Sequence, residues 1–401
     1  MNASSVANLK LAWAILAVAA VCVAVCSSTE YGEDWPQFHL GPEHIGASPS
    51  TAPRTNQTAW MSEEIGAQEG SSVSVAEGRV YVNGVDSIVC LDQGTGEVLW
   101  NVSFEATPEI CQVWGFSPVY DNGKVFASGA KTVCLDAATG DPLWSFVPPS
   151  GRGAVDGGPT VYDGKVVVSD WDGQHYHCLD EASGREIWNF TVEGNAQSTP
   201  AISDGRVVFG GWEWGLGGNL YCAYMEDGAI VWNITTENSP CGSAAILDGV
   251  VYATTYNFEG NGEIMALSLV DGSLLWENEI QRTDSTPTLA EGKVYVCGGC
   301  DGFSDLQTYC FNASTGALVW ETDPEERIGE WRCSVAYADG LIFVKRSGDD
   351  AGICALDATT GELVWSYPGA GSAAAVAGGM VFSLGDGRVY AFGDVAASNG
   401  V

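Results

Sequence analysis

The stretch VCLDAATGDPLW, Val133–Trp144, occurs seven times in this 401-residue chain with small changes. Its closing tryptophan recurs every 44 residues, with one step of 45, at Trp100, Trp144, Trp188, Trp232, Trp276, Trp320 and Trp365. Most copies contain Asp-x-x-Thr-Gly or a close variant, in which the Asp or Thr side chain can bond the turn backbone while Gly takes a positive φ. The stretch therefore predicts two strands joined by a tight turn, and it is not a catalytic motif.

Between these copies lies a second regular unit, in which small residues run into a turn ending in Gly. FSPVYDNG, residues 116–123, and STPTLAEG, residues 285–292, are two of eight such segments, and a β-rich run follows each. A short turn between two strands is expected in each unit. Four strands in about 44 residues, repeated around the chain, are typical of a β-propeller blade. We predict an all-β fold, an eight-bladed β-propeller of four-stranded antiparallel blades.

Seven fourth strands and eight inner hairpins leave the last blade one strand short. TAWMSEE, residues 58–64, supplies a matching strand, because Trp60 lies 40 residues before Trp100. We predict that this N-terminal strand pairs with the last blade, at GMVFSL and RVYAFG, and closes the ring. Closure removes an exposed sheet edge and ties the two ends of the chain together.

The ends of the chain predict export. Residues 11–26 form an apolar run behind Lys10, about as long as a signal-peptide core and short for a membrane span. We expect an extracytoplasmic protein, secreted or anchored at the cell surface, that associates with a membrane only through this segment. The expected division is a signal peptide or anchor over 1–26, a lead-in segment over 27–56, the propeller over 57–394 and a flexible tail over 395–401.

The charge balance narrows the class of partner. The chain has 51 acidic and 16 basic residues, a net charge of −35. Nucleic acid and anionic membrane surfaces are excluded as partners, because both need a basic patch. An acidic surface of this kind is typical of a soluble protein that faces salty water or cations.

Asn-x-Ser/Thr sequons are more frequent than composition predicts. The candidate glycosylation sites beyond the apolar run are Asn56, Asn101, Asn189, Asn233 and Asn312. Three of them directly follow a repeat tryptophan. That position is compatible with a polar site inherited by each repeat, and also with glycans at the rim of an exported protein, which is the interpretation we favour.

With this motif, period and blade count, the chain resembles the PQQ-type β-propeller repeat family, which includes eight-bladed quinoprotein dehydrogenases and BamB-like assembly proteins. DWPQFHLGPEHIG, residues 34–46, also resembles the lead-in of secreted members. The resemblance implies the fold. Quinoprotein enzymes hold their quinone over a disulfide of adjacent Cys and use Glu, Asn and Asp on calcium. This chain has no Cys-Cys pair and no motif that matches the carboxylate set, so we predict no cofactor and no bound metal.

Cysteine and histidine supply the candidates for redox and metal chemistry. Cys90, Cys134, Cys178, Cys222 and Cys310 recur at multiples of 44 residues and are expected to fill the core of the third strands. Cys297 and Cys300 form a Cys-x-x-Cys, compatible with a local disulfide, half of a metal site or a redox pair, and we favour the disulfide. His175 and His177 lie on one face of a strand but lack a third ligand nearby in sequence, so a packed pair is expected.

The long connections predict a binding face. In a four-strand meander, the connections between strands two and three and between blades emerge on one side, and the tight turns emerge on the other. Aromatic side chains on the loops of an exported protein favour recognition of a ligand or partner. Nearby arginines could hold a carboxylate or a sugar. The residues predicted to form this ligand or partner face are Trp114, Phe116, Trp171, Trp212, Trp214, Tyr256, Trp331, Arg152 and Arg332.

Three functional hypotheses remain open. The favoured one is a non-enzymatic binding or scaffold propeller that engages an envelope protein, a peptide or a glycan through this face. The second is a divergent PQQ-dependent quinoprotein oxidoreductase. The third is a structural envelope component in which glycans and acidity matter more than a pocket. One fold hosts many unrelated sites, so the fold alone does not separate them.

Overall fold

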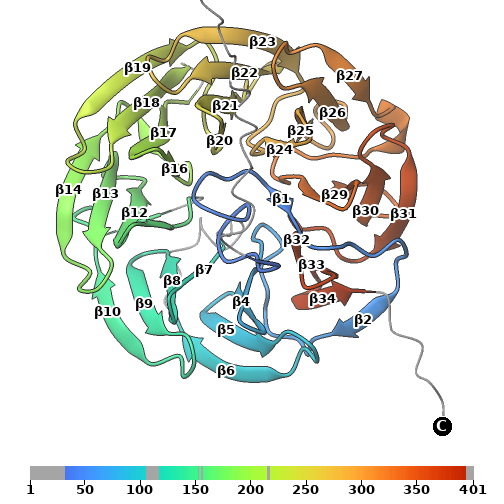
Figure 1. The fold of residues 1–401 in the computed structure, drawn as a ribbon, viewed down its shortest axis with the longest axis horizontal. Coiled ribbons are helices and arrows are strands. Elements are labelled where there is room, and N and C mark those ends of the chain that lie inside the picture. The colour runs from blue at the N-terminus through green and yellow to red at the C-terminus, as the bar shows by residue number, and fades with distance from the viewer. Residues whose placement is uncertain (1–31, 105–116, 152, 155–156, 215–216, 394–401) are drawn as a thin grey trace, which may run out of the picture.

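A computed structural model describes residues 32–104, 117–151, 153–154, 157–214 and 217–393 of the chain. The strands in these ranges form eight separate sheets around one axis (Figure 1). A 3-10 turn, η1 (Pro324–Glu326), is the helical element among them, and no helix there is long and apolar enough to cross a membrane. The predicted eight-bladed, all-β propeller is confirmed.

The first four blades run from the axis to the rim in chain order. Blade one contains β3 (Ser74–Ala76), β4 (Arg79–Asn83), β5 (Ser87–Asp92) and β6 (Val98–Ser103). Blade two contains β7 (Val119–Asp121), β8 (Lys124–Ser128), β9 (Thr132–Asp136) and β10 (Pro142–Phe146). Blade three contains β11 (Thr160–Tyr162), β12 (Lys165–Asp170), β13 (His175–Asp180) and β14 (Glu186–Thr191). Blade four contains β16 (Ala201–Ser203), β17 (Arg206–Trp212), β18 (Gly218–Tyr224) and β19 (Ile230–Thr236), with the short β15 (Asn195–Ala196) added on β17.

The other four blades complete the ring. Blade five contains β20 (Ala245–Leu247), β21 (Val250–Thr254), β22 (Gly262–Ser268) and β23 (Leu274–Ile280). Blade six contains β24 (Thr288–Ala290), β25 (Lys293–Gly298), β26 (Gln307–Asn312) and β27 (Leu318–Glu321). Blade seven contains β28 (Ala336–Ala338), β29 (Leu341–Arg346), β30 (Gly352–Asp357) and β31 (Leu363–Pro368), with β1 (Ala47–Ser48) parallel to β28. Blade eight contains β32 (Ala375–Ala377), β33 (Met380–Gly385), β34 (Arg388–Phe392) and β2 (Thr58–Met61).

The ring closes in the way that the sequence predicted. The N-terminal strand β2 pairs antiparallel with β34, and Trp60 lies opposite Ala391. In Figure 1 the blue β2 lies beside the red β34 at the rim. The two ends of the propeller therefore share one sheet.

The repeat tryptophans lie at the seams between blades. The Nε1 of each donates a hydrogen bond to a backbone carbonyl of the next blade or of the segment that precedes β2. The acceptor oxygens are those of Gln93 for Trp60 (2.8 Å), Ala137 for Trp100 (3.0 Å), Glu181 for Trp144 (2.8 Å), Met225 for Trp188 (3.1 Å), Leu269 for Trp232 (2.9 Å), Ala313 for Trp276 (2.8 Å), Ala358 for Trp320 (3.2 Å) and Pro53 for Trp365 (3.1 Å).

The glycine of the repeated turn completes each seam. Gly228 has φ +72°, and a Cβ built on it would come within 2.9 Å of the Trp188 ring. In blade one, Asp92 Oδ1 accepts from the backbone of Gly94 (3.0 Å) and Thr95 (2.9 Å), as the turn motif requires. The repeated stretch is therefore a turn of one blade fitted under the tryptophan of the blade before it.

The outer strands carry a bulge next to the tryptophan. In blade three, Cys178 lies opposite Trp188 and Leu179 lies opposite Glu186, so Ile187 has no partner in the ladder. The same register shift occurs in the other six blades that end in a repeat tryptophan. A bulge interrupts the flat row of backbone groups that an edge strand offers to other chains.

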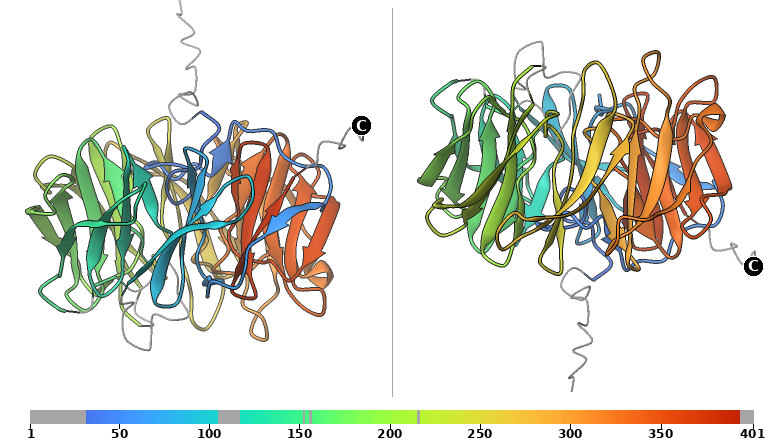
Figure 2. Two further views of the ribbon diagram at one scale, coloured as in Figure 1. Left: turned by 90° about the horizontal axis from the view of Figure 1, so that it is seen from below. Right: turned by 90° about the horizontal axis from the view of Figure 1, so that it is seen from above.

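The lead-in segment winds around the axis and contacts the innermost strand or turn of all eight blades. Its carbonyls or side chains bond the backbone N–H of one residue in each blade: Gly378 to Glu33, Val75 to Trp35, Tyr120 to Pro36, Val161 to Gln37, Ile202 to Pro42, Ile246 to Glu43, Leu289 to Ile45 and Tyr337 to Gly46. Seen from the side, the molecule is a disc, with the blue lead-in near its axis at one face (Figure 2). The segment that the sequence treated as a separate lead-in is thus built into the centre of the ring.

Two histidines of this segment are structural. His39 and His44 are buried, and His44 Nδ1 donates to the carbonyl of Ala244 at 3.1 Å. Burial, and next the neighbouring His39, lower the pKa of His44 to about 3. The ring is therefore neutral in the folded protein at pH 7.

We expect His44 to make the fold sensitive to acid. The unfolded chain binds a proton at His44 below about pH 6.5, whereas the folded protein does not until about pH 3. Stability is therefore lost as the pH falls through this window, with a slope approaching about 1.4 kcal/mol per pH unit. Urea unfolding of the wild type and of His44→Gln between pH 7 and 4 measures it, since the glutamine does not titrate. A stability difference that stays constant with pH would contradict the assignment.

Candidate binding face

The long connections gather on one face of the disc. The inner strands run from this face to the hairpin turns, so the β12–β13, β17–β18, β21–β22 and β25–β26 connections emerge together with the links between blades. We call this the loop face, and the opposite side, which carries the short turns and the lead-in, the turn face. The arrangement predicted for a four-strand meander is the one observed.

Aromatic side chains on the loop face form one continuous cluster, the aromatic ridge, which crosses from blade three to blade seven. Its contacts, given as distances between ring centroids, are Trp171–Trp212 (5.6 Å), Trp212–Trp214 (5.0 Å), Trp214–Phe258 (4.9 Å), Phe258–Tyr256 (4.9 Å) and Tyr256–Trp331 (5.3 Å). These distances and the tilted or edge-on ring orientations are those favoured by aromatic pairs. Six rings from four connections thus make one surface.

The ridge contains most of the face that the sequence predicted. Trp214 is 64% exposed, Trp171 and Trp331 are half-buried, and Trp212 and Tyr256 are buried beneath them. Arg332 stacks on Trp331, with its Cζ 4.1 Å from the ring centroid. Trp114, Phe116 and Arg152 lie outside the described residues.

Two members of the ridge region escaped the sequence reasoning. Phe258 links Trp214 to Tyr256, and Arg282 lies over the Tyr256 ring at 5.8 Å while it donates to the carbonyl of Phe258. Phe258 is on the same connection as Tyr256, so the clustering of aromatics on that connection was the available signal. Arg282 carried no such signal, because its connection joins two blades and holds no aromatic residue.

A cavity of about 90 Å³ opens on the axis beside the ridge. Residues just ahead of the innermost strands line it, together with Phe38 of the lead-in. Its wall is fixed by hydrogen bonds between blades: Thr199 N donates to Ser243 Oγ at 2.9 Å, and Thr286 N donates to Ser334 Oγ at 3.0 Å. We call it the axial cavity. Trp331 and Arg332 line it and also belong to the ridge region, so the two features are continuous.

Asp284 is the carboxylate of the axial cavity. Its side chain lies beside Arg332 and accepts a hydrogen bond from Cys241, and its Oδ1 has no hydrogen-bond partner among the residues that the structure describes. Desolvation raises the pKa of Asp284 to about 7 and outweighs the opposing effects of Arg332 and Cys241. Asp284 can therefore donate or accept a proton near neutral pH. Sequence reasoning missed it, because nothing in its connection distinguishes it from the many turn carboxylates.

A larger hollow, of about 520 Å³, lies on the turn face. Carboxylates line it, among them Asp34 and Asp121, whose pKa values burial raises. None of the residues that line it has a buried side-chain polar atom without a hydrogen-bond partner, whereas the axial cavity has several. The axial cavity is therefore the better candidate for a ligand.

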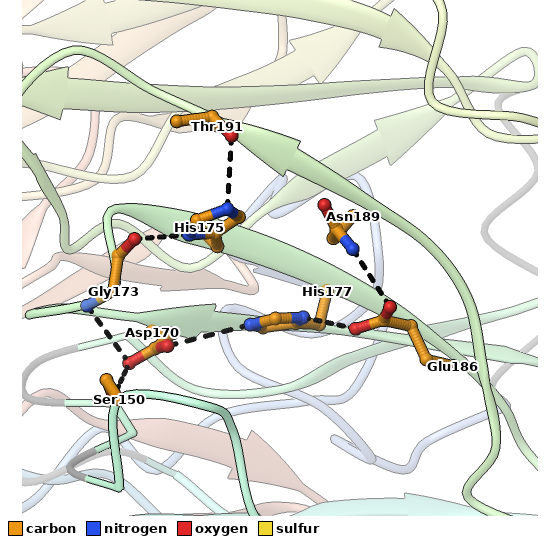
Figure 3. A network of polar contacts seen from close by, with 8 residues as sticks. All are labelled: Ser150, Asp170, Gly173, His175, His177, Glu186, Asn189 and Thr191. Atoms are coloured by element: carbon orange, nitrogen blue, oxygen red, sulfur yellow. Dashed lines mark hydrogen bonds and ion pairs between the residues drawn. The ribbon is translucent and has the colours of Figure 1, made fainter.

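The histidine pair belongs to a network of polar contacts that joins β12, β13 and β14 of blade three (Figure 3). His177 is buried on β13, with Nδ1 2.6 Å from Glu186 Oε2 and Nε2 3.7 Å from Asp170 Oδ2. His175 stacks beside it at 5.7 Å and bonds Thr191. The interactions lower the pKa of Asp170 and Glu186 despite the opposing effect of burial. In the described ranges, no group of three or more His, Cys, Asp or Glu side chains is arranged to hold a metal ion.

The predicted Cys297–Cys300 disulfide is wrong, because both residues are free thiols in the structure. Cys297 is the buried fifth residue of β25, and its sulfur contacts Ser285 Oγ and the carbonyl of Glu330 inside the seam. Cys300 lies beyond the strand end, where its backbone N–H donates to Ser304 Oγ. The strand thus directs Cys297 inward while the loop holds Cys300 outside. The repeat cysteines are buried and free as expected, and burial raises the pKa of Cys178 to about 12.

Three of the sequons lie on outermost strands, with Asn101 on β6, Asn189 on β14 and Asn233 on β19. Asn56, Asn101, Asn189 and Asn233 are exposed. Asn312 is half-buried, because its Oδ1 caps a turn by accepting from Ser314 N and Thr315 N. Glycosylation at these sites stays a prediction, and the geometry makes Asn312 the least accessible of them.

Comparison with known proteins gives a consistent picture of the fold. The family described as "Outer membrane protein assembly factor BamB" matches residues 50–147, 129–308 and 261–399. No curated protein sequence matches the chain significantly. Among solved structures, BamB from Moraxella catarrhalis is 17% identical with a TM-score of 0.64, over 83% of this chain and 96% of that one.

Solved quinoprotein enzymes share slightly lower identities and higher TM-scores with the chain. The quinohemoprotein alcohol dehydrogenase ADHIIG from Pseudomonas putida HK5 is 13% identical with a TM-score of 0.72, over 94% of this chain and 82% of that one. A europium-containing methanol dehydrogenase is 15% identical with a TM-score of 0.70, over 89% and 90% of the two chains. At such identities the likeness shows the fold alone, and it includes both an assembly factor and enzymes.

Proposed function

This chain belongs to the PQQ-type β-propeller family whose model is described as "Outer membrane protein assembly factor BamB", and we propose that it is a non-enzymatic, extracytoplasmic binding propeller. It engages an envelope protein, a peptide or a glycan through its loop face. The observation that carries the proposal is the aromatic ridge, in which the exposed Trp214 is backed by buried rings. Rigid aromatic groups supported from beneath are typical energetic centres of binding surfaces.

The setting of the ridge supports binding to a partner from solution. The apolar run at residues 11–26 and the exposed sequons support export of the chain. The net charge of −35 leaves arginine scarce, yet Arg282 and Arg332 both lie against ridge rings. Arginine on an aromatic face supplies planar hydrogen-bond donors in a fixed orientation.

The quinoprotein alternative fits these residues poorly. A quinone with calcium needs a set of oxygen ligands around the ion, whereas the axial cavity offers one carboxylate, that of Asp284. Its volume of about 90 Å³ is also well below the roughly 300 Å³ at which pockets for cofactor-sized ligands begin. We therefore derive no redox chemistry for this chain.

The proposal predicts that one exposed ring controls binding. On arrays of defined peptides and glycans, the wild-type protein is expected to bind one of these classes, and Trp214→Ser is expected to weaken binding at least tenfold, the usual effect of removing a central aromatic anchor. The matched control is Val270→Ser, because Val270 is equally exposed, at 64%, but lies on the turn face. Equal binding by wild type and Trp214→Ser would contradict the proposal.

The wild-type protein also tests the alternative function, a PQQ-dependent oxidoreductase. With PQQ and calcium added, we expect neither a saturable change in absorbance nor reduction of a redox dye by alcohols or sugars. Saturable PQQ binding accompanied by dye reduction would replace the binding function with the oxidoreductase.

A further inference from the structure

Several buried polar atoms that line the axial cavity have no hydrogen-bond partner in the described part of the chain. Ser117 Oγ, Gln197 Oε1 and Asp284 Oδ1 lie ahead of the innermost strands of blades two, four and six, and all three residues line the cavity. Ser117 is 1% and Gln197 is 4% exposed. A buried polar group without a partner costs about 1–3 kcal/mol. Three of them around one hollow indicate a place where a ligand supplies the missing hydrogen bonds.

The chemistry of these atoms selects the kind of ligand. Gln197 Oε1 accepts, Ser117 Oγ both donates and accepts, and Asp284 accepts when ionised and donates when protonated. The Arg332 guanidinium, a donor, lines the same hollow. A carboxylate ligand would be repelled by the Gln197 oxygen and by ionised Asp284, and an ammonium group would be repelled by Arg332. Hydroxyl groups, which donate and accept through one atom, match the mixed set.

The ridge supplies the remaining half of the site. Trp331 lines the cavity and contacts Tyr256 of the ridge at 5.3 Å. The cavity volume of about 90 Å³ admits a few hydroxyl groups and not a whole oligosaccharide. The C–H faces of sugar rings pack on indole and phenol rings, so units beyond the first can lie along the ridge.

We propose that the axial cavity and the aromatic ridge together bind a neutral glycan. The hydroxyls of its terminal sugar are held by Ser117, Gln197 and Asp284, and the following sugar rings pack on Trp331 and the ridge beyond it. This inference rests on the proposed function and names the ligand class of the same face. It involves no covalent step.

Titration of the full chain with defined saccharides tests the inference. The probes are glucose, galactose, mannose and N-acetylglucosamine with their short oligomers, followed by calorimetry and by tryptophan fluorescence. Citrate and spermidine serve as an anionic and a cationic comparison. We expect saturable one-to-one binding of at least one neutral saccharide, tighter for the oligomer than for its monomer, and neither comparison compound should bind.

Variants of the unpartnered residues connect binding to the cavity. Ser117→Ala and Gln197→Leu are each expected to weaken saccharide binding about tenfold, the usual effect of one hydrogen bond in a buried site. Neither variant should lower the melting temperature, because Ser117 Oγ and Gln197 Oε1 have no hydrogen-bond partner among the described residues. The matched control is Ser169→Ala, since Ser169 Oγ is also buried and unpartnered but does not line the cavity.

The outcomes separate this inference from the function on which it rests. Saccharide binding that survives Ser117→Ala and Gln197→Leu overturns the cavity as the site. Binding of citrate or spermidine alone overturns the ligand class. Peptide binding that depends on Trp214, with no saccharide bound, overturns the glycan inference and leaves the binding propeller standing. Unchanged binding in Trp214→Ser overturns both the glycan inference and the proposed binding function.

Discussion

Replacing Trp188 with alanine is expected to lower the free energy of unfolding by about 3–5 kcal/mol, the usual cost of removing a buried aromatic side chain. Trp188 is 7% exposed and packs in the core between blades three and four with Val192 and Met225. Its truncation leaves a void over Gly228 and leaves the carbonyl of Met225 without its 3.1 Å bond. Urea denaturation followed by circular dichroism measures the change.

The control for this variant is Trp214→Ala. Trp214 is the same residue type but lies exposed on the loop face, outside the seams. We expect its truncation to cost much less, about 1 kcal/mol or below. A loss under about 1 kcal/mol for Trp188→Ala as well would show that the repeat tryptophans are not seam residues.

Deleting residues 56–64 is expected to open the ring. The deletion removes β2, exposes β34 as an edge and leaves the carbonyl of Gln93 without the Trp60 indole. An exposed edge strand next to a hydrophobic core promotes pairing between chains. We expect a lower melting temperature and dimers or larger species by light scattering after size exclusion.

The same strand offers a control and a rescue. Met61→Ser changes a half-exposed side chain of β2 but keeps the backbone pairing, so the protein should stay monomeric with nearly unchanged melting. A synthetic peptide of residues 56–64 should restore part of the lost stability by adding the strand in trans. A deletion variant that remains monomeric and melts like the wild type would contradict closure through β2.

Some of the binding face could be predicted from the sequence, and the part that could not has a physical reason. Trp171, Trp212, Trp214 and Trp331 were identifiable because they interrupt a repeat whose other tryptophans fall at a fixed position. Their contacts within the ridge, the burial of Trp212 and the half-burial of Trp171 and Trp331 depend on how four connections pack together. The Cys297–Cys300 pairing was predicted wrongly, because spacing in a loop does not show that one of the two cysteines belongs to a strand.

The sequence by itself determined the features that are local and periodic. A tight turn, a strand with small residues and a tryptophan at a fixed offset each reflect interactions within one blade or between neighbouring blades, so each repeat carries the whole signal. The blade count, closure by β2 and the place of Trp188 in a seam follow from that repetition.

Only the tertiary structure decided what lies on the axis. Ser117, Gln197 and Asp284 are separated by 80 and 87 residues in the chain, yet ring closure brings them to one cavity. The path of the lead-in across all eight blades and the raised pKa of Asp284 depend on the same convergence. Burial and the loss of water at the centre belong to the closed ring as a whole, and no single repeat encodes them.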